Sequence, residues 1–119
     1  MAKLPQFIAV YGTLRRGFRA STHMRDCSPV GDVAIKGAMF DLGGIPGVDL
    51  ADTSRKFYAE VYRLPKTQDV RAEVIERLDS YEAEGFLYDR KVVQTKFGPT
   101  YVYEYKGAIV GREPIFKWA

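Results

Sequence analysis

Glu82 is the acidic residue whose place in the sequence best suits it to proton transfer. A helix over residues 69–81 gathers apolar side chains within an arc of roughly 140°, taking about 100° per residue, and Glu82 follows Leu78 by one turn on that arc. The apolar members of the arc are Val70, Val74, Ile75, Leu78 and Tyr81. A carboxyl group that points toward a core is partly desolvated, and desolvation raises its pKa toward the range useful for a general base or acid.

Two other interpretations of Glu82 stay open on the residues alone. The helix can end near Tyr81, which would leave the Glu82 carboxylate in solvent. Alternatively, Glu82 pairs with Arg90 in a structural salt bridge. An unpaired carboxylate is rarely found on a buried face. The three interpretations place the Glu82 side chain near the core as a proton-transfer group, in solvent, or in an ion pair with Arg90.

The second candidate element is the turn that follows the apolar run at residues 7–11. Uncharged, β-branched and aromatic residues in this run predict a buried strand. Gly12 ends the strand with a residue that can adopt backbone angles forbidden to other residues and lets a ligand approach the main chain closely. The backbone amides of Gly12, Thr13 and Leu14 are then candidates for a cradle that holds an anion or a carbonyl oxygen. An ordinary tight turn remains the simpler interpretation.

Two further patterns do not fit the chemistry that their spacing suggests. A pair of glycines five residues apart resembles a phosphate-binding loop, but Phe18 and Arg19 stand where that loop needs Lys and then Ser or Thr. His23 and Cys27 share a helix face at a spacing of four, but they are the only His and the only Cys in the chain. Without a third ligand they do not predict a metal site. We therefore expect neither a nucleotide, a metal nor another cofactor.

The composition is that of a soluble globular protein. At 119 residues, 46% of them hydrophobic and 28% charged, the chain is long enough for one domain over residues 1–119. The net charge of +3 is spread along the sequence, so nucleic acid is not an expected partner. No apolar stretch reaches the length of about 18 residues that a membrane helix needs, and no segment resembles a secretion signal. With one cysteine and no disulfide, we expect a cytoplasmic protein.

The remaining sequence predicts β structure around the helix. Gly- and Pro-rich segments predict a loop over residues 43–47 and a turn at residues 98–99. Ser21 or Thr22 is expected to cap a short helix. Residues 107–119 form a tail whose apolar side chains are expected to pack back on the body. Strands are predicted over residues 30–42, 57–64, 86–97 and 100–105, which gives the α+β class.

Several of these segments, taken together, resemble the gamma-glutamylcyclotransferase-like family, of the gamma-glutamylamine cyclotransferase type. The matching motifs are the Val-Tyr-Gly-Thr-Leu-Arg-Arg-Gly run from Val10, Leu-Asp-Ser-Tyr-Glu ending at Glu82, Tyr88-Asp89-Arg90, the Gly-Ile-Pro-Gly loop at residues 44–47, and Ala-Glu-Val-Tyr at residues 59–62. The resemblance extends from residue 8 to residue 105. Three positions depart from the family pattern: Ala59 and Ala83 replace Gly, and Ser-Thr-His at residues 21–23 replaces Asn-His.

The resemblance implies a small mixed β-barrel with one main packed helix and one short helix. It also implies a lyase or transferase reaction without a cofactor, in which a small-molecule γ-glutamyl amide cyclises to 5-oxoproline and releases an amine. Glu82 would act as general base and then general acid, and Tyr11, Gly12, Thr13 and Leu14 would bind the substrate. A non-catalytic small-molecule-binding module on the same barrel is the alternative. The oligomeric state is not indicated.

Overall fold

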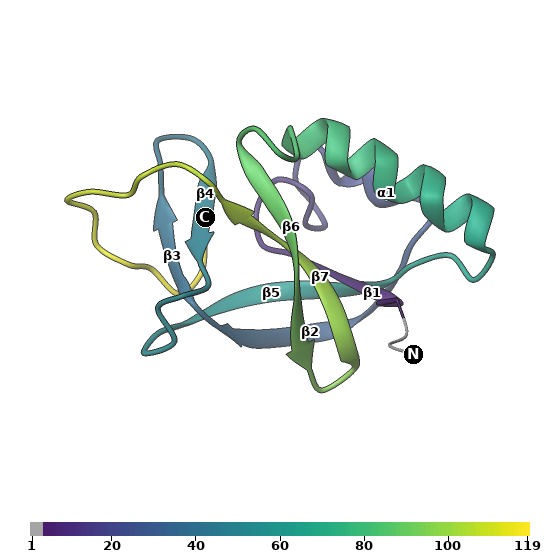
Figure 1. The fold of residues 1–119 in the computed structure, drawn as a ribbon, viewed down its shortest axis with the longest axis horizontal. Helices are drawn as coiled ribbons and strands as arrows, with labels where there is room; N and C mark the ends of the chain where they lie inside the picture. Colours follow the sequence, from purple (N-terminus) through teal and green to yellow (C-terminus); the bar gives the residue numbers. More distant parts are fainter. Residues whose placement is uncertain (1–3) are drawn as a thin grey trace.

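The computed structural model describes residues 4–119, which form one sheet, one hairpin and one long helix (Figure 1). The elements in chain order are β1 (Phe7–Val10), the 3₁₀ turn η1 (Ser21–Met24), β2 (Ser28–Lys36), β3 (Ala38–Asp41), β4 (Pro46–Asp49), β5 (Lys56–Arg63), α1 (Gln68–Glu82), β6 (Tyr88–Thr95) and β7 (Gly98–Tyr105). The α+β class predicted from the sequence is confirmed. None of the helices described has the length and apolar character that crossing a membrane requires.

The short strand β1 lies at the centre of the sheet, whose order is β2-β5-β1-β7-β6. It pairs antiparallel with β5 and parallel with β7. All four of its residues are buried, because both faces of the sheet are covered. Ile8 and Val10 pack in a core shared with α1, whereas Phe7 and Ala9 pack in a second core shared with the β3–β4 hairpin.

The helix α1 covers one face of the sheet and ends directly after Glu82. It begins and ends one residue beyond the predicted range of 69–81. Val74 and Leu78 are fully buried, but Val70 and Tyr81 at the two ends of the arc are 41% and 38% exposed. The helix stops at Ala83, which has a left-handed backbone with φ of 50°. The Glu84 amide then donates to the Asp79 carbonyl at 2.9 Å and the Ala83 amide to the Ser80 carbonyl at 3.3 Å, the Schellman pattern of a helix end.

Three predicted boundaries are wrong, in each case near a glycine. The strand predicted over residues 30–42 is divided at Gly37, where an added Cβ would lie 3.0 Å from the Phe57 ring. Residues 46–47, predicted as loop, begin β4 and pair with β3. Gly98 and Pro99, predicted as a turn, begin β7 and pair with β6, because the turn comes two residues earlier. A glycine therefore does not always mark a loop in this chain: Gly37 separates two strands, whereas Gly47 and Gly98 lie within strands.

The sheet is open as far as residues 4–119 describe it, so the predicted small mixed β-barrel is not confirmed. Its edge strands are β2 and β6, and no hydrogen-bonded pairing joins them within the described chain. The turn between β6 and β7 approaches β2 instead: its Phe97 ring lies so close to Gly31 of β2 that a Cβ at Gly31 would be 3.0 Å from it. The sheet therefore curves toward closure without completing it.

The chain after β7 returns to the body of the protein, as its apolar residues predict. Ile115 forms a bridge with Met39 of β3, and the Tyr58 amide donates to the Phe116 carbonyl at 2.7 Å. Trp118 is buried, whereas the Phe116 side chain is 55% exposed. Figure 1 shows this yellow segment beside the β3–β4 hairpin. In the 3₁₀ turn η1 the capping residue is Ala20 and no side chain caps the turn, so the Ser21 or Thr22 cap is wrong.

Candidate active site

A cavity of about 220 Å³ lies where the turn after β1 meets the end of α1. It brings together the two sequence elements singled out for chemistry, the turn and Glu82. Among the residues that the structure describes, Glu82 is the only charged one that lines it. The lining residues are Ala9, Val10, Tyr11, Gly12, Thr13, Leu14, Ile45, Pro46, Tyr81, Glu82, Leu87, Tyr88 and Tyr103.

Glu82 is partly buried at the last position of α1, with its carboxyl group at this cavity. Burial raises its pKa from 4.5 to about 7. No cationic side chain of the described residues forms an ion pair with it, because Arg90 pairs with Asp79 instead. Both alternatives left open by the sequence, a carboxylate in bulk solvent and a salt bridge to Arg90, are therefore wrong. At neutral pH this carboxyl group is poised between its protonated and ionised forms.

The Asp79 carboxylate ties the last turn of α1 to the sheet. One of its oxygens pairs with the Arg90 guanidinium on β6, and the other accepts a hydrogen bond from the Tyr103 hydroxyl on β7 at 2.7 Å. Asp79 precedes Glu82 by three residues and so lies on a neighbouring part of the helix surface. These contacts hold the end of the helix that carries Glu82 against β6 and β7. Asp79 and Arg90 each belong to a motif in the sequence, but neither motif alone predicts that the two side chains pair.

Tyrosines are prominent among the residues that line the cavity. Tyr81 and Thr13 share a hydrogen bond of 2.6 Å, which joins the helix end to the turn. The Tyr11 hydroxyl donates to the Tyr103 carbonyl at 2.6 Å, and the Tyr88 hydroxyl donates to the Pro46 carbonyl at 2.7 Å. Burial raises the pKa of Tyr11 and of Tyr88 well above the usual value, so both remain protonated donors. Tyr81, Tyr88 and Tyr103 were not predicted as site residues.

The turn after β1 presents unused backbone amides. The Gly12 carbonyl accepts a hydrogen bond from the Arg15 amide and the Thr13 carbonyl accepts one from the Ala20 amide, both at 3.1 Å. Within residues 4–119, no group accepts a hydrogen bond from the amides of Gly12, Thr13 or Leu14. Donors of this kind can hold an anion or a carbonyl oxygen.

Gly12 allows the turn to pack closely against Pro46 and does not adopt an unusual backbone angle. Its φ is not in the positive region that favours glycine. Instead, a Cβ at this position would lie 2.8 Å from Pro46 Cγ, closer than real contacts allow. The turn and the start of β4 therefore touch directly at one wall of the cavity. The expectation that Gly12 adopts special angles is wrong, whereas close approach of the main chain to a neighbour is observed.

His23 and Cys27 do not form a reactive pair. The His23 ring packs against the Tyr81 ring, with 4.9 Å between their centroids. Cys27 is buried, and burial raises the pKa of its thiol to about 11, so it is protonated at neutral pH. Across the described part of the chain, no three His, Cys, Asp or Glu side chains gather closely enough to hold a metal ion.

A larger groove of about 900 Å³ runs along another side of α1, between the helix and Tyr101. Neither Glu82 nor any residue of the turn lines it. Its charged residues include Asp79 and Arg90, which already satisfy each other. Size alone would favour this groove, but Glu82, whose pKa is raised, and the residues of the turn line the smaller cavity. The smaller cavity is therefore the candidate site.

In this small α+β fold, partly buried Glu82 lines one cavity together with a turn whose backbone amides have no acceptor among the described residues. The chain belongs to the family described as gamma-glutamyl cyclotransferase, AIG2-like, whose family model matches residues 8–117. Among curated proteins it is similar to the gamma-glutamylcyclotransferase family protein YtfP of Escherichia coli K12, with 29% identity over 105 residues, 87% of this chain and 86% of that protein.

Solved structures show the same fold. An uncharacterised protein of Pyrococcus horikoshii superposes with a TM-score of 0.74 at 29% identity. The match covers 93% of this chain and 86% of the Pyrococcus chain. An AIG2-like protein of Mus musculus gives a TM-score of 0.76 at 17% identity, with 96% of this chain and 88% of that chain covered. At this low identity the mouse structure supports the fold alone.

Proposed function

We propose that this protein is a γ-glutamyl cyclotransferase, which converts a γ-glutamyl amide into 5-oxoproline and a free amine. The observation that carries the proposal is the cavity that Glu82 shares with the amides of Gly12, Thr13 and Leu14. A carboxyl group with a pKa of about 7 accepts and returns a proton readily at neutral pH. Membership of the family supports the same activity.

The reaction needs two proton transfers and stabilisation of one oxyanion. The α-amine of the γ-glutamyl group attacks its own γ-carbonyl carbon, and the ionised Glu82 takes a proton from that amine. The carbonyl oxygen becomes negative and accepts hydrogen bonds from the turn amides. When the carbon–nitrogen bond to the leaving amine breaks, Glu82 returns the proton to that amine. The ring of 5-oxoproline is then closed and the carboxylate is regenerated.

Ring closure also requires a folded substrate, and we propose that the cavity holds it in that conformation. Nucleophile and carbonyl belong to one substrate, so holding the chain folded can contribute about 7–11 kcal/mol to lowering the barrier. No lysine or arginine within residues 4–119 lines the cavity. We infer that the substrate carboxylate binds through backbone amides and hydroxyl groups, with Tyr11, Thr13 and the other turn residues in contact with substrate. The reaction as written uses no metal or cofactor.

Incubation with a panel of γ-glutamyl amides, followed by mass spectrometry for 5-oxoproline, tests the proposal. The panel includes amino acid, dipeptide, polyamine and lysine ε-amine leaving groups. We expect Glu82→Gln to lower kcat by a factor of roughly 10²–10⁴, because Gln keeps the shape of the side chain and loses the proton transfer. Glu84→Gln is the matched control, since Glu84 is exposed and lies outside the cavity. Unchanged turnover in Glu82→Gln would refute the assignment.

The same panel tests a non-catalytic binding module. A ligand that raises the melting temperature without any 5-oxoproline formation would favour a binding module. A carboxylate in the cavity argues against that outcome for anionic ligands, because it would repel them without any gain. Catalysis, by contrast, uses this carboxylate for proton transfer.

A further inference from the structure

Arg15 is a buried cation without an acidic partner. Its side chain belongs to a residue only 2% exposed, and no carboxylate of the described residues lies within ion-pair distance of it. The guanidinium stacks on the Phe18 ring, 4.5 Å from the centroid, and donates to the Trp118 carbonyl. Burying a charge is costly unless hydrogen bonds compensate for lost water. The guanidinium also lies over the Tyr58 ring, 5.9 Å from its centroid, and makes one further hydrogen bond, to the turn after β1.

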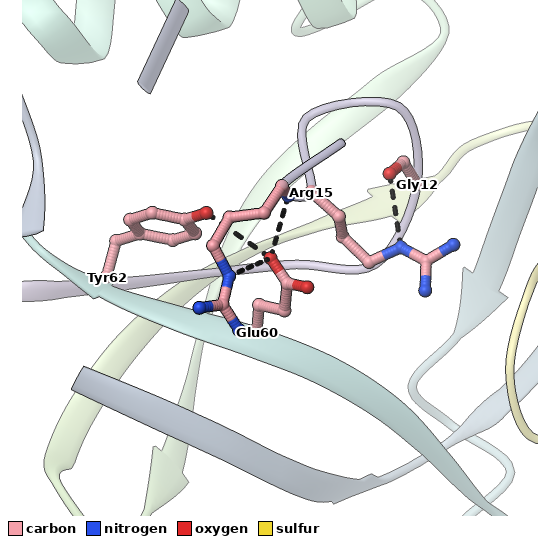
Figure 2. A network of polar contacts seen from close by, with 5 residues as sticks. Gly12, Arg15, Glu60 and Tyr62 are labelled. Carbon is pink, nitrogen blue, oxygen red and sulfur yellow. Dashed lines mark hydrogen bonds and ion pairs between the residues drawn. The ribbon is translucent and has the colours of Figure 1, made fainter. Parts of the chain in front are cut away.

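That contact joins Arg15 to the cradle. Arg15 Nε donates to the Gly12 carbonyl at 3.3 Å, which Figure 2 shows beside the turn, and the Arg15 amide donates to the same oxygen at 3.1 Å. A peptide unit is planar and trans, so its carbonyl and the following amide point in opposite directions. Two donors on the Gly12 carbonyl thus direct the Thr13 amide away from Arg15. Thr13 lines the cavity and Arg15 does not.

Two further contacts hold the rest of the turn. The Ala20 amide donates to the Thr13 carbonyl, which fixes the orientation of the Leu14 amide in the same way. The buried Glu60 carboxylate accepts hydrogen bonds from the Arg16 amide at 3.0 Å and from the Tyr62 hydroxyl at 3.3 Å (Figure 2). The turn is therefore anchored at its beginning, middle and end.

We propose that Arg15 is a positioning residue: it locks the peptide between Gly12 and Thr13 so that the Thr13 amide faces the reacting carbonyl oxygen. This inference rests on the proposed function and adds a residue that touches no substrate. A lysine cannot replace it, because one ammonium group cannot reach the Gly12 and Trp118 carbonyls in the planar geometry of a guanidinium. The oxyanion forms only in the transition state, so the effect belongs to kcat more than to KM.

Kinetics of Arg15→Gln and Arg15→Lys test the inference. We expect either change to lower kcat by roughly 10- to 100-fold, with KM within about threefold, because one oxyanion donor is misdirected. Arg19→Gln is the control: this arginine is exposed, four residues away and makes no contact with the turn amides. Arg15→Lys keeps the charge and the apolar stem, so it serves if Arg15→Gln does not fold.

A crystal structure of Arg15→Lys provides a readout independent of turnover. We expect the peptide between Gly12 and Thr13 to be rotated or present in two orientations. A single unrotated peptide, or a kcat within threefold of wild type in both variants, would overturn the inference. If the wild type forms no 5-oxoproline from any substrate, the proposed function fails, and the peptide orientation alone then decides the role of Arg15.

Discussion

Replacing Glu82 by Gln should stabilise the protein in a manner that depends on pH. Burial raises the pKa of this carboxyl group from 4.5 to about 7. One pKa unit corresponds to about 1.4 kcal/mol, so keeping the ionised carboxylate in the cavity costs about 3 kcal/mol of folding free energy. Gln is similar in shape to the protonated form and carries no charge at any pH. The variant is therefore free of that cost.

The sign follows from the protons bound in each state. Below pH 4.5, Glu82 is protonated in the folded and in the unfolded protein, so the pKa difference has no effect. Between pH 4.5 and about pH 7 the unfolded chain loses this proton while the folded protein keeps it, and the free energy of unfolding falls as pH rises. Above this window both states are ionised and the difference stays constant. Glu82→Gln should thus gain about 3 kcal/mol over wild type by pH 8 and little at pH 4.

Urea unfolding between pH 4 and pH 8 measures this difference. Trp118 is the single tryptophan and is buried, so its fluorescence reports on unfolding. For a chain of this length a gain of that size corresponds to roughly 10 °C in melting temperature. Glu84→Gln controls for the loss of a negative charge near the helix end and should follow the wild type. A difference between Glu82→Gln and wild type that is constant across the pH range would refute the reasoning.

Three other substitutions test the surroundings of Glu82. Ala83→Gly should raise the free energy of unfolding by about 0.5–1 kcal/mol in urea, because the left-handed φ of 50° strains Ala by more than Gly loses in chain entropy; no gain would contradict that strain. Gly12→Ala should lower both stability and kcat, since its Cβ would lie 2.8 Å from Pro46 Cγ, and a normal melting temperature would show that Pro46 moves aside freely. Asp79→Asn should lower the free energy of unfolding by about 1–2 kcal/mol, because it removes the ion pair with Arg90, and should lower kcat as measured by 5-oxoproline release. An unaffected kcat would show that this ion pair does not position Glu82.

Local patterns in the sequence were sufficient for the elements whose signal is periodic. The helix and the inward direction of its Leu78 face follow from the 3.6-residue repeat, and the central strand follows from its unbroken apolar run. The same repeat wrongly includes Tyr81 in the core, because periodicity indicates a face but not how far a neighbour covers it. Strand ends near Gly37 and Gly98 were missed, since glycine can break a strand or lie within one.

Contacts between segments far apart in the chain could not be predicted from the sequence patterns. The Arg15 guanidinium meets the Trp118 carbonyl across most of the chain, and a backbone acceptor has no residue signature. Similarly, Asp79 and Arg90 each belonged to a motif, but only the folded helix end shows that they pair with each other. The roles assigned to Glu82 and to the turn amides remain predictions for the experiments above.

The position of β1 has a consequence for how the molecule acquires its structure. This strand of four residues needs β5 on one side and β7 on the other, and β7 emerges from the ribosome about ninety residues later. Until then one of its edges lacks a hydrogen-bonding partner, and contacts of such long sequence separation form slowly. We expect the nascent chain to stay incompletely folded until the last strand docks, and chaperones that shield exposed strand edges to improve its yield.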